Sequence, residues 1–290
     1  MKGTRLKNLI ETFVNILSHF DRRTPTRTVY LATAAALLYA GLSRRQLILR
    51  HEKAVKTELL SKLPPLLRAY VRPHGQLYRV SLDIVDVVDR IISNRLAVEL
   101  IGGRADLNFV RKVLIKELGR VSYVLLYDCL SIPEFLTIAT SLKARGYEAT
   151  FSPTCFLNPL GLTRFITEQA YPSRARATMK DVLKTLTDAL GAIGGELIRE
   201  VDEKVHEYGQ LGIGALTDNV NIDMIISKCE TYARRGVTLV ASDHGYDVIS
   251  NTTHILITHG AREEQQSYKV ILNFSKIAPF MAVSRRPSPQ

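Results

Sequence analysis

The pattern of hydrophobic and polar positions changes near Gly102-Gly103. Before this point, apolar residues recur at helical spacing, as in 6–20 and 43–63. After it, apolar runs of strand length alternate with longer amphipathic segments, which is typical of an α/β sheet flanked by helices. We therefore predict a mainly helical N-terminal domain over 1–103 and an α/β domain over 104–290.

Within the α/β domain, most of the predicted strands are separated by helices, and this arrangement favours a mostly parallel sheet. The strands are expected at 122–127, 148–151, 197–201, 238–241, 254–258 and 267–272. The helices are expected at 107–117, 133–145, 179–190 and 222–235.

The overall composition is that of a globular protein, with 290 residues, 46% hydrophobic residues and 23% charged residues. The apolar run 29–42 is shorter than the roughly 20 residues that a membrane-spanning helix needs, so no transmembrane segment is predicted. Cys129, Cys155 and Cys229 are scattered and odd in number, which does not suit a disulfide framework. These features predict a cytoplasmic protein.

The net charge of +11 is concentrated at the N-terminus, where residues 1–72 hold 14 Lys and Arg against 4 Asp and Glu. This asymmetry favours a polyanionic partner, either nucleic acid or an anionic membrane surface, although a solvated basic surface explains it equally well. The peptide Gly41–Leu47 resembles the corner of a helix-turn-helix, and an ordinary helix break accounts for the same residues.

Polar side chains follow several predicted strands at the point where each strand ends. In an open α/β sheet, ligands bind beyond the carboxyl ends of the strands. Carboxylate oxygens mixed with imidazole nitrogens suit Zn²⁺ or Mn²⁺, whereas a thiolate site would need clustered cysteines. Each residue alone is explained as a helix cap or a surface histidine, but the joint pattern is more specific. The candidate metal ligands are Asp128, Asp202, His206, Asp243, His244 and His259.

The order of these residues resembles the alkaline phosphatase superfamily and, more narrowly, a PglZ domain, over roughly 105–275. The resemblance is carried by the peptides Tyr127–Leu130, Asp202–His206, Ser242–Gly245 and His259–Glu264. It implies an alkaline-phosphatase-like fold with two divalent ions, Zn²⁺ or Mn²⁺ rather than Mg²⁺. One ion would be held by Asp202, His206 and His259, and the other by Asp128, Asp243 and His244.

The resemblance also implies a nucleophile between the ions, on the loop and helix start that follow the second strand of the domain. Ser152-Pro153-Thr154 has that place in the sequence, and Thr154 is the first choice. Ser152, Cys155 and a hydroxide derived from water remain open alternatives. Two departures from the PglZ pattern are Ser131, where Arg is common, and Ala261, where a second Gly is common.

The leading functional hypothesis is a two-metal hydrolase of phosphate esters, most simply a phosphodiesterase or nuclease-like enzyme, recruited to a polyanion by the basic N-terminal domain. The same ligand set also serves small-molecule phosphatases and sulfatases, because a fold does not fix its substrate. A third hypothesis is a nucleic-acid-binding protein with a catalytically silent hydrolase-like domain.

Overall fold

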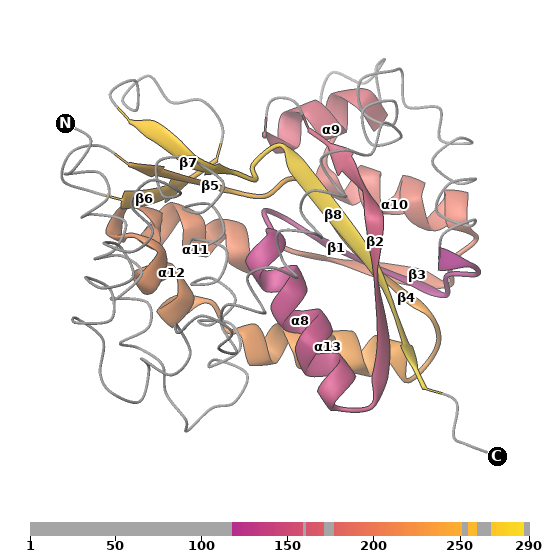
Figure 1. The fold of residues 1–290 in the computed structure, drawn as a ribbon. Coiled ribbons are helices and arrows are strands. Elements are labelled where there is room, and N and C mark those ends of the chain that lie inside the picture. The colour runs from indigo at the N-terminus through magenta and orange to yellow at the C-terminus, as the bar shows by residue number, and fades with distance from the viewer. Residues whose placement is uncertain (1–117, 159–160, 171–176, 251–254, 260–267, 287–290) are drawn as a thin grey trace.

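The computed structural model describes residues 118–158, 161–170, 177–250, 255–259 and 268–286 (Figure 1). The predicted N-terminal domain, the helix expected at 107–117 and the corner at Gly41–Leu47 lie outside these residues. None of the described helices is long and apolar enough to cross a membrane.

The centre of the described region is a five-stranded sheet with the order β2-β8-β4-β1-β3. β1 runs parallel to both β3 and β4, whereas β8 runs antiparallel to both β4 and β2. The predicted α/β class is confirmed, and the sheet is parallel over β4-β1-β3 only. The strands are β1 (Tyr123–Tyr127), β2 (Tyr147–Leu157), β3 (Gly194–Ile198), β4 (Thr238–Ser242) and β8 (Ile277–Arg285).

Helices cover both faces of this sheet (Figure 1). On one face, the apolar stripe of α10 (Met179–Leu190) packs against Val124 and Leu126 of β1 and Leu239 of β4. The alternate residue Tyr127 points to the opposite face, where its hydroxyl lies 3.9 Å from the Cys229 thiol of α13 (Ile222–Ala233). α8 (Ile132–Ala144) contacts α13, and α9 (Thr163–Ala170) contacts α10.

The turn that connects β1 to α8 is fixed by a capping box. The Ser131 amide donates to the Glu134 carboxylate, and the Ser131 hydroxyl caps the first turn of the helix. The other carboxylate oxygen of Glu134 accepts a hydrogen bond from the buried Tyr246 hydroxyl at 2.8 Å. This network ties the segment after β1 to the segment after β4, where candidate ligands lie.

A second, antiparallel sheet with the order β6-β5-β7 lies beside the main one (Figure 1). It contacts α11 (Glu200–Tyr208), η1 (Gly209–Leu211) and α12 (Ile213–Asn219) through β6. A Cβ atom on Gly209 would lie only 2.6 Å from the Ile257 carbonyl oxygen, so glycine permits this close approach. The strands of this sheet are β5 (Asp247–Ser250), β6 (Ile255–Thr258) and β7 (Lys269–Asn273).

Several predicted elements differ from the observed ones. The strand predicted at 197–201 is displaced, because β3 ends at Ile198 and α11 already begins at Glu200. The strand predicted at 148–151 continues to Leu157. α9, α11, α12, β5 and β8 were not predicted.

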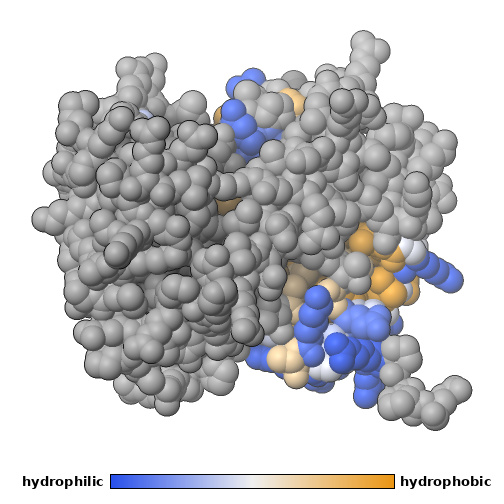
Figure 2. All heavy atoms as spheres, in the orientation of Figure 1, coloured by the Kyte–Doolittle hydropathy of each residue, from blue (hydrophilic) through white to orange (hydrophobic). Residues whose placement is uncertain are grey.

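Charged side chains at the surface connect the end of α8 to α13. In Figure 2, hydrophilic residues gather at the lower right of the view, near the junction of α8 and β2 in Figure 1. Arg145, which follows α8, forms ion pairs there with Asp223 and Glu230 of α13, at 3.5 and 3.3 Å. Most of the apolar residues of α13 are buried.

Candidate metal centre

The ends of the parallel strands β1 and β4 bring two predicted ligands together. Tyr127 and Ser242 are paired in register, so Asp128 and Asp243 follow at the same level of the sheet. One oxygen of Asp243, Oδ1, accepts hydrogen bonds from the amides of Cys129 at 3.1 Å and His244 at 2.9 Å. Its Oδ2 is buried and has no hydrogen-bond partner in the described structure. That oxygen is available to a ligand.

The His244 imidazole is buried and its tautomer is determined by its neighbours. Nδ1 lies 2.9 Å from the Gly245 carbonyl oxygen, which can only accept, so Nδ1 carries the hydrogen. In the neutral imidazole Nε2 then presents its lone pair, and it lies 3.6 Å from Asp128 Oδ1 and 3.5 Å from Asp243 Oδ2. An imidazole oriented through a carbonyl bond at its other nitrogen is the usual arrangement of a metal-ligating histidine.

α11 and β6 supply the remaining predicted ligands. Asp202 and His206 lie one helical turn apart on α11, with His206 Nε2 3.5 Å from Asp202 Oδ1. His259 follows β6 and its Nε2 lies 2.9 Å from the same Asp202 oxygen and 3.3 Å from His206 Nε2. The His259 ring is also 4.6 Å from the His244 ring, between centroids, so the two halves of the site adjoin.

The structure thus brings all of the predicted metal ligands together. Among the residues that the structure describes, ligand atoms lie within 4.8 Å of one another in two groups, Asp128 with Asp202 and His244, and Cys129 with Asp202 and His259. Asp202 is common to both groups. The donor set, together with the unpartnered Asp243 Oδ2, fits a divalent cation.

Converging carboxylates make the electrostatics of the site unfavourable for the chain alone. Burial, followed by the charges of Asp243 and Asp202, raises the pKa of Asp128 to about 7. Burial also pushes the pKa of Asp202 upward, but the hydrogen bond and charge of His259 and the other histidines outweigh it, and the pKa lies below its ordinary value. A cation would offset the repulsion that Asp128 experiences.

The hydroxyl of Thr163, the first residue of α9, lies at the centre and was not predicted. Its Oγ1 is 3.3 Å from Asp128 Oδ1 and 3.2 Å from His244 Nε2. Buried Asn158 holds the preceding loop, because its Oδ1 accepts from the amides of Gly161 and Leu162 and its Nδ2 donates to the Asp243 carbonyl oxygen. Thr163 occupies a helix start after β2, which is the place where the nucleophile was expected.

Thr154 lies elsewhere in the secondary structure than predicted. The segment 152–154 was expected to form a loop and helix start, but it lies within β2, where the register against β8 shifts between Phe151 and Cys155. The prediction of a loop there is wrong, because β2 continues through the irregularity to Leu157. The side chains of Ser152, Thr154 and Cys155 lie outside the described part of the structure.

The chain was also compared with known proteins. No known protein family matches it, and no curated protein matches it.

Proposed function

We propose that the protein is a divalent-metal-dependent hydrolase of phosphate esters. The observation that carries this proposal is the convergence of carboxylates and imidazoles from separate segments of the chain at one centre. The Thr163 hydroxyl lies at the same centre, 3.3 Å from Asp128 Oδ1. The ligands would be Asp128, Asp202, His206, Asp243, His244 and His259.

The residues of the chain have distinct tasks in this proposal. Asp202, His206 and His259 would hold one ion, and Asp128, Asp243 and His244 the other. Two divalent ions so held would stabilise the charge of a transferring phosphoryl group and acidify a nearby hydroxyl. The high content of imidazole favours Zn²⁺ over Mg²⁺, and Mn²⁺ is the alternative that the carboxylate oxygens suit.

Thr163 is the attacking group in this proposal, in place of Thr154. Its hydroxyl already contacts a ligand from each of two strand ends, at 3.3 Å to Asp128 and 3.2 Å to His244. Asn158 is a positioning residue, because it holds the backbone of the loop that leads to Thr163 and ties that loop to the Asp243 carbonyl.

The order of the ligands and the helix-start position of Thr163 support a PglZ-like domain of the alkaline phosphatase superfamily. Within phosphate esters, we favour phosphodiesters as the substrate class. The basic charge of residues 1–72 supports this choice, because it would attract a polyanion such as nucleic acid.

The test is hydrolysis of bis-p-nitrophenyl phosphate by the full-length protein with Zn²⁺, Mn²⁺, Mg²⁺ or EDTA. Turnover should require a metal ion and should be lost in Asp243→Asn. Thr163→Ala should lower kcat by at least about a thousandfold, whereas Thr163→Ser should retain turnover, because it keeps a hydroxyl. Thr154→Ala should stay close to the unsubstituted protein.

Two results would contradict parts of the proposal. Loss of turnover in Thr154→Ala together with normal turnover in Thr163→Ala would assign the nucleophile to Thr154 instead. No turnover with any of these metals, together with no bound metal by elemental analysis, would refute the hydrolase itself.

A further inference from the structure

We infer that Cys129 is a metal ligand, and that its thiolate makes one of the two ion positions selective for Zn²⁺ over Mn²⁺. This inference rests on the metal centre of the proposed function. It concerns a residue that the predicted ligand sets do not contain, and it makes the two positions chemically different.

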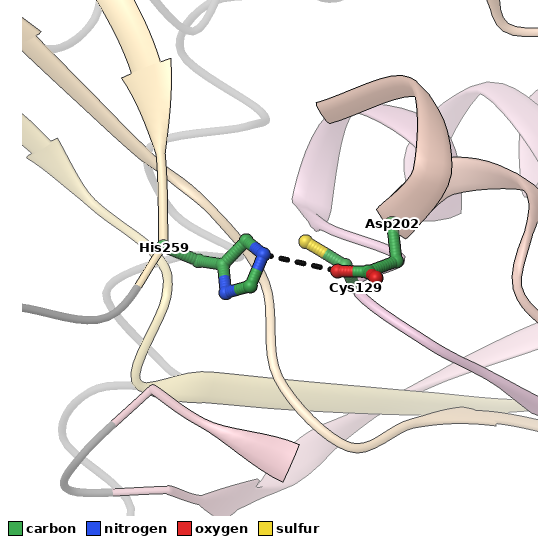
Figure 3. A group of neighbouring side chains, drawn as sticks. All are labelled: Cys129, Asp202 and His259. Carbon is green, nitrogen blue, oxygen red and sulfur yellow. Dashed lines mark ion pairs between the residues drawn. The ribbon is translucent and has the colours of Figure 1, made fainter. Parts of the chain in front are cut away.

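The geometry of Cys129 supports this role. Its Sγ, a carboxylate oxygen of Asp202 and a ring nitrogen of His259 all lie within 4.8 Å of one another. In Figure 3 the three side chains come from separate segments, and the sulfur lies close to the ion pair that joins His259 to Asp202. Three donors of different kinds thus face one small space.

The backbone holds the thiol in this direction. Cys129 has a φ of 62°, in the left-handed region that non-glycine residues seldom adopt. Its amide is bonded to Asp243 Oδ1 at 3.1 Å, which fixes the turn between β1 and α8. The fully buried thiol donates a weak, 3.6 Å hydrogen bond to the Gly245 carbonyl oxygen. Coordination would release this proton to solvent and replace that bond with a bond from sulfur to the ion.

The donors around this position suit Zn²⁺. His206 Nε2 lies 3.3 Å from His259 Nε2 and would complete a set of one sulfur, two nitrogens and one carboxylate oxygen. Four ligands that include thiolate and imidazole are the typical zinc set, whereas Mn²⁺ and Mg²⁺ prefer oxygen. The neighbouring position has only oxygen and nitrogen donors, from Asp128, Asp243 and His244, and would accept Mn²⁺ as well.

Cys229 provides the internal comparison. It is also a buried free thiol, but it faces the Tyr127 hydroxyl on the other side of the sheet and belongs to neither of the candidate ligand groups in the described residues. A buried cysteine commonly acts as a small apolar side chain, and Cys229 fits that description. Cys129 differs because carboxylate and imidazole groups surround its sulfur.

The experiment is a titration of the full-length protein with Co²⁺, which substitutes for Zn²⁺ and gives a near-ultraviolet charge-transfer band when thiolate binds it. The unsubstituted protein and Cys229→Ala should show the band. Cys129→Ser should lose the band while still binding Co²⁺. Its affinity for Zn²⁺ should fall at least about tenfold, since loss of a ligand should cost no less than loss of an outer partner of a ligand, and its affinity for Mn²⁺ should change less. A Cys155→Ser/Cys229→Ala double variant, whose only thiol is Cys129, should keep the band.

The double variant tests the inference even where Cys129→Ser does not fold. Bound Co²⁺ without a thiolate band in the unsubstituted protein would overturn the role of Cys129 and leave the proposed hydrolase intact. A band that persists in Cys129→Ser would do the same. Failure of the unsubstituted protein to bind Co²⁺, Zn²⁺ or Mn²⁺ would overturn both proposals.

Discussion

Substitution of Asp128 by Asn should have opposite effects on stability with and without a divalent metal. The raised pKa of Asp128, about 7 against an ordinary 3.8, means that the folded protein holds this proton more tightly than the unfolded chain. At about 1.36 kcal/mol per pKa unit, ionised Asp128 lowers the free energy of unfolding by up to about 4 kcal/mol. Asn removes the charge, so the variant should be the more stable protein in EDTA at about pH 8.

The sign of the pH dependence follows from the same shift. Stability from the protonated carboxyl is fully present below the unfolded pKa, near 4, and is lost as the pH rises through about 7. The advantage of Asp128→Asn should therefore be close to zero near pH 4 and should reach its maximum above pH 7. Asp188→Asn, an exposed carboxylate in an i,i+4 ion pair, is the matched control and should show little change at either pH.

Addition of metal should reverse the order of the two proteins. An ion present at about a thousand times its Kd adds about 4 kcal/mol to the stability of the protein that binds it. Asp128→Asn lacks a ligand and should gain much less. The assay is urea unfolding followed by circular dichroism, in EDTA and with Zn²⁺ or Mn²⁺. Equal stability of the two proteins in EDTA at pH 8, or an equal gain from metal, would refute this account of Asp128.

Three further substitutions test the surroundings of the centre. Gly209→Ala should push η1 away from β6 at the Ile257 carbonyl and lower the free energy of unfolding by about 1–3 kcal/mol. Elemental analysis should then find fewer bound ions. Asn158→Ala should lower kcat more than it changes KM, since it releases the loop before Thr163, while Asn219→Ala on α12 should leave kinetics unchanged. Tyr246→Phe should lower the free energy of unfolding by about 1.5–3 kcal/mol, because the buried Glu134 carboxylate loses a hydrogen-bond donor. Tyr232→Phe removes the same kind of donor from the half-buried Glu196 and should lower the free energy of unfolding by less.

The candidate ligands could be predicted because the property that identifies them is local. Asp128 and Asp243 each follow a short apolar strand, and parallel neighbours end at the same edge of a sheet. The i,i+4 spacing of Asp202 and His206 is also a local feature, since it puts both side chains on one face of α11. The parallel pairing of β1 with β4 then brings Asp128 and Asp243 to the same level of the sheet.

Thr163 could not be found in the same way, because its position depends on pairing over a long distance in sequence. β2 was expected to end at 151, but β8 pairs with it as far as Leu157, across a shift in register. Because β2 continues to Leu157, Thr154 lies inside the strand, and the loop that leads to α9 begins at Asn158. The sequence spacing of Asn158, Gly161 and Thr163 ahead of a helix was the local signal available.

The residues proposed for the two ion positions differ in their burial. Asp128, Asp243 and His244 extend from the main sheet, and their side chains are at most 9% exposed. Asp202 and His206 are 22% and 46% exposed, and His259 reaches them only because β6 pairs with β5, which starts soon after His244. Cys129 follows β1 of the main sheet, yet its sulfur faces Asp202 and His259 of the other group. Together with Asp202 on α11, its thiol would therefore connect the main sheet to the more exposed position, and an ion bound there would link the second sheet to the first.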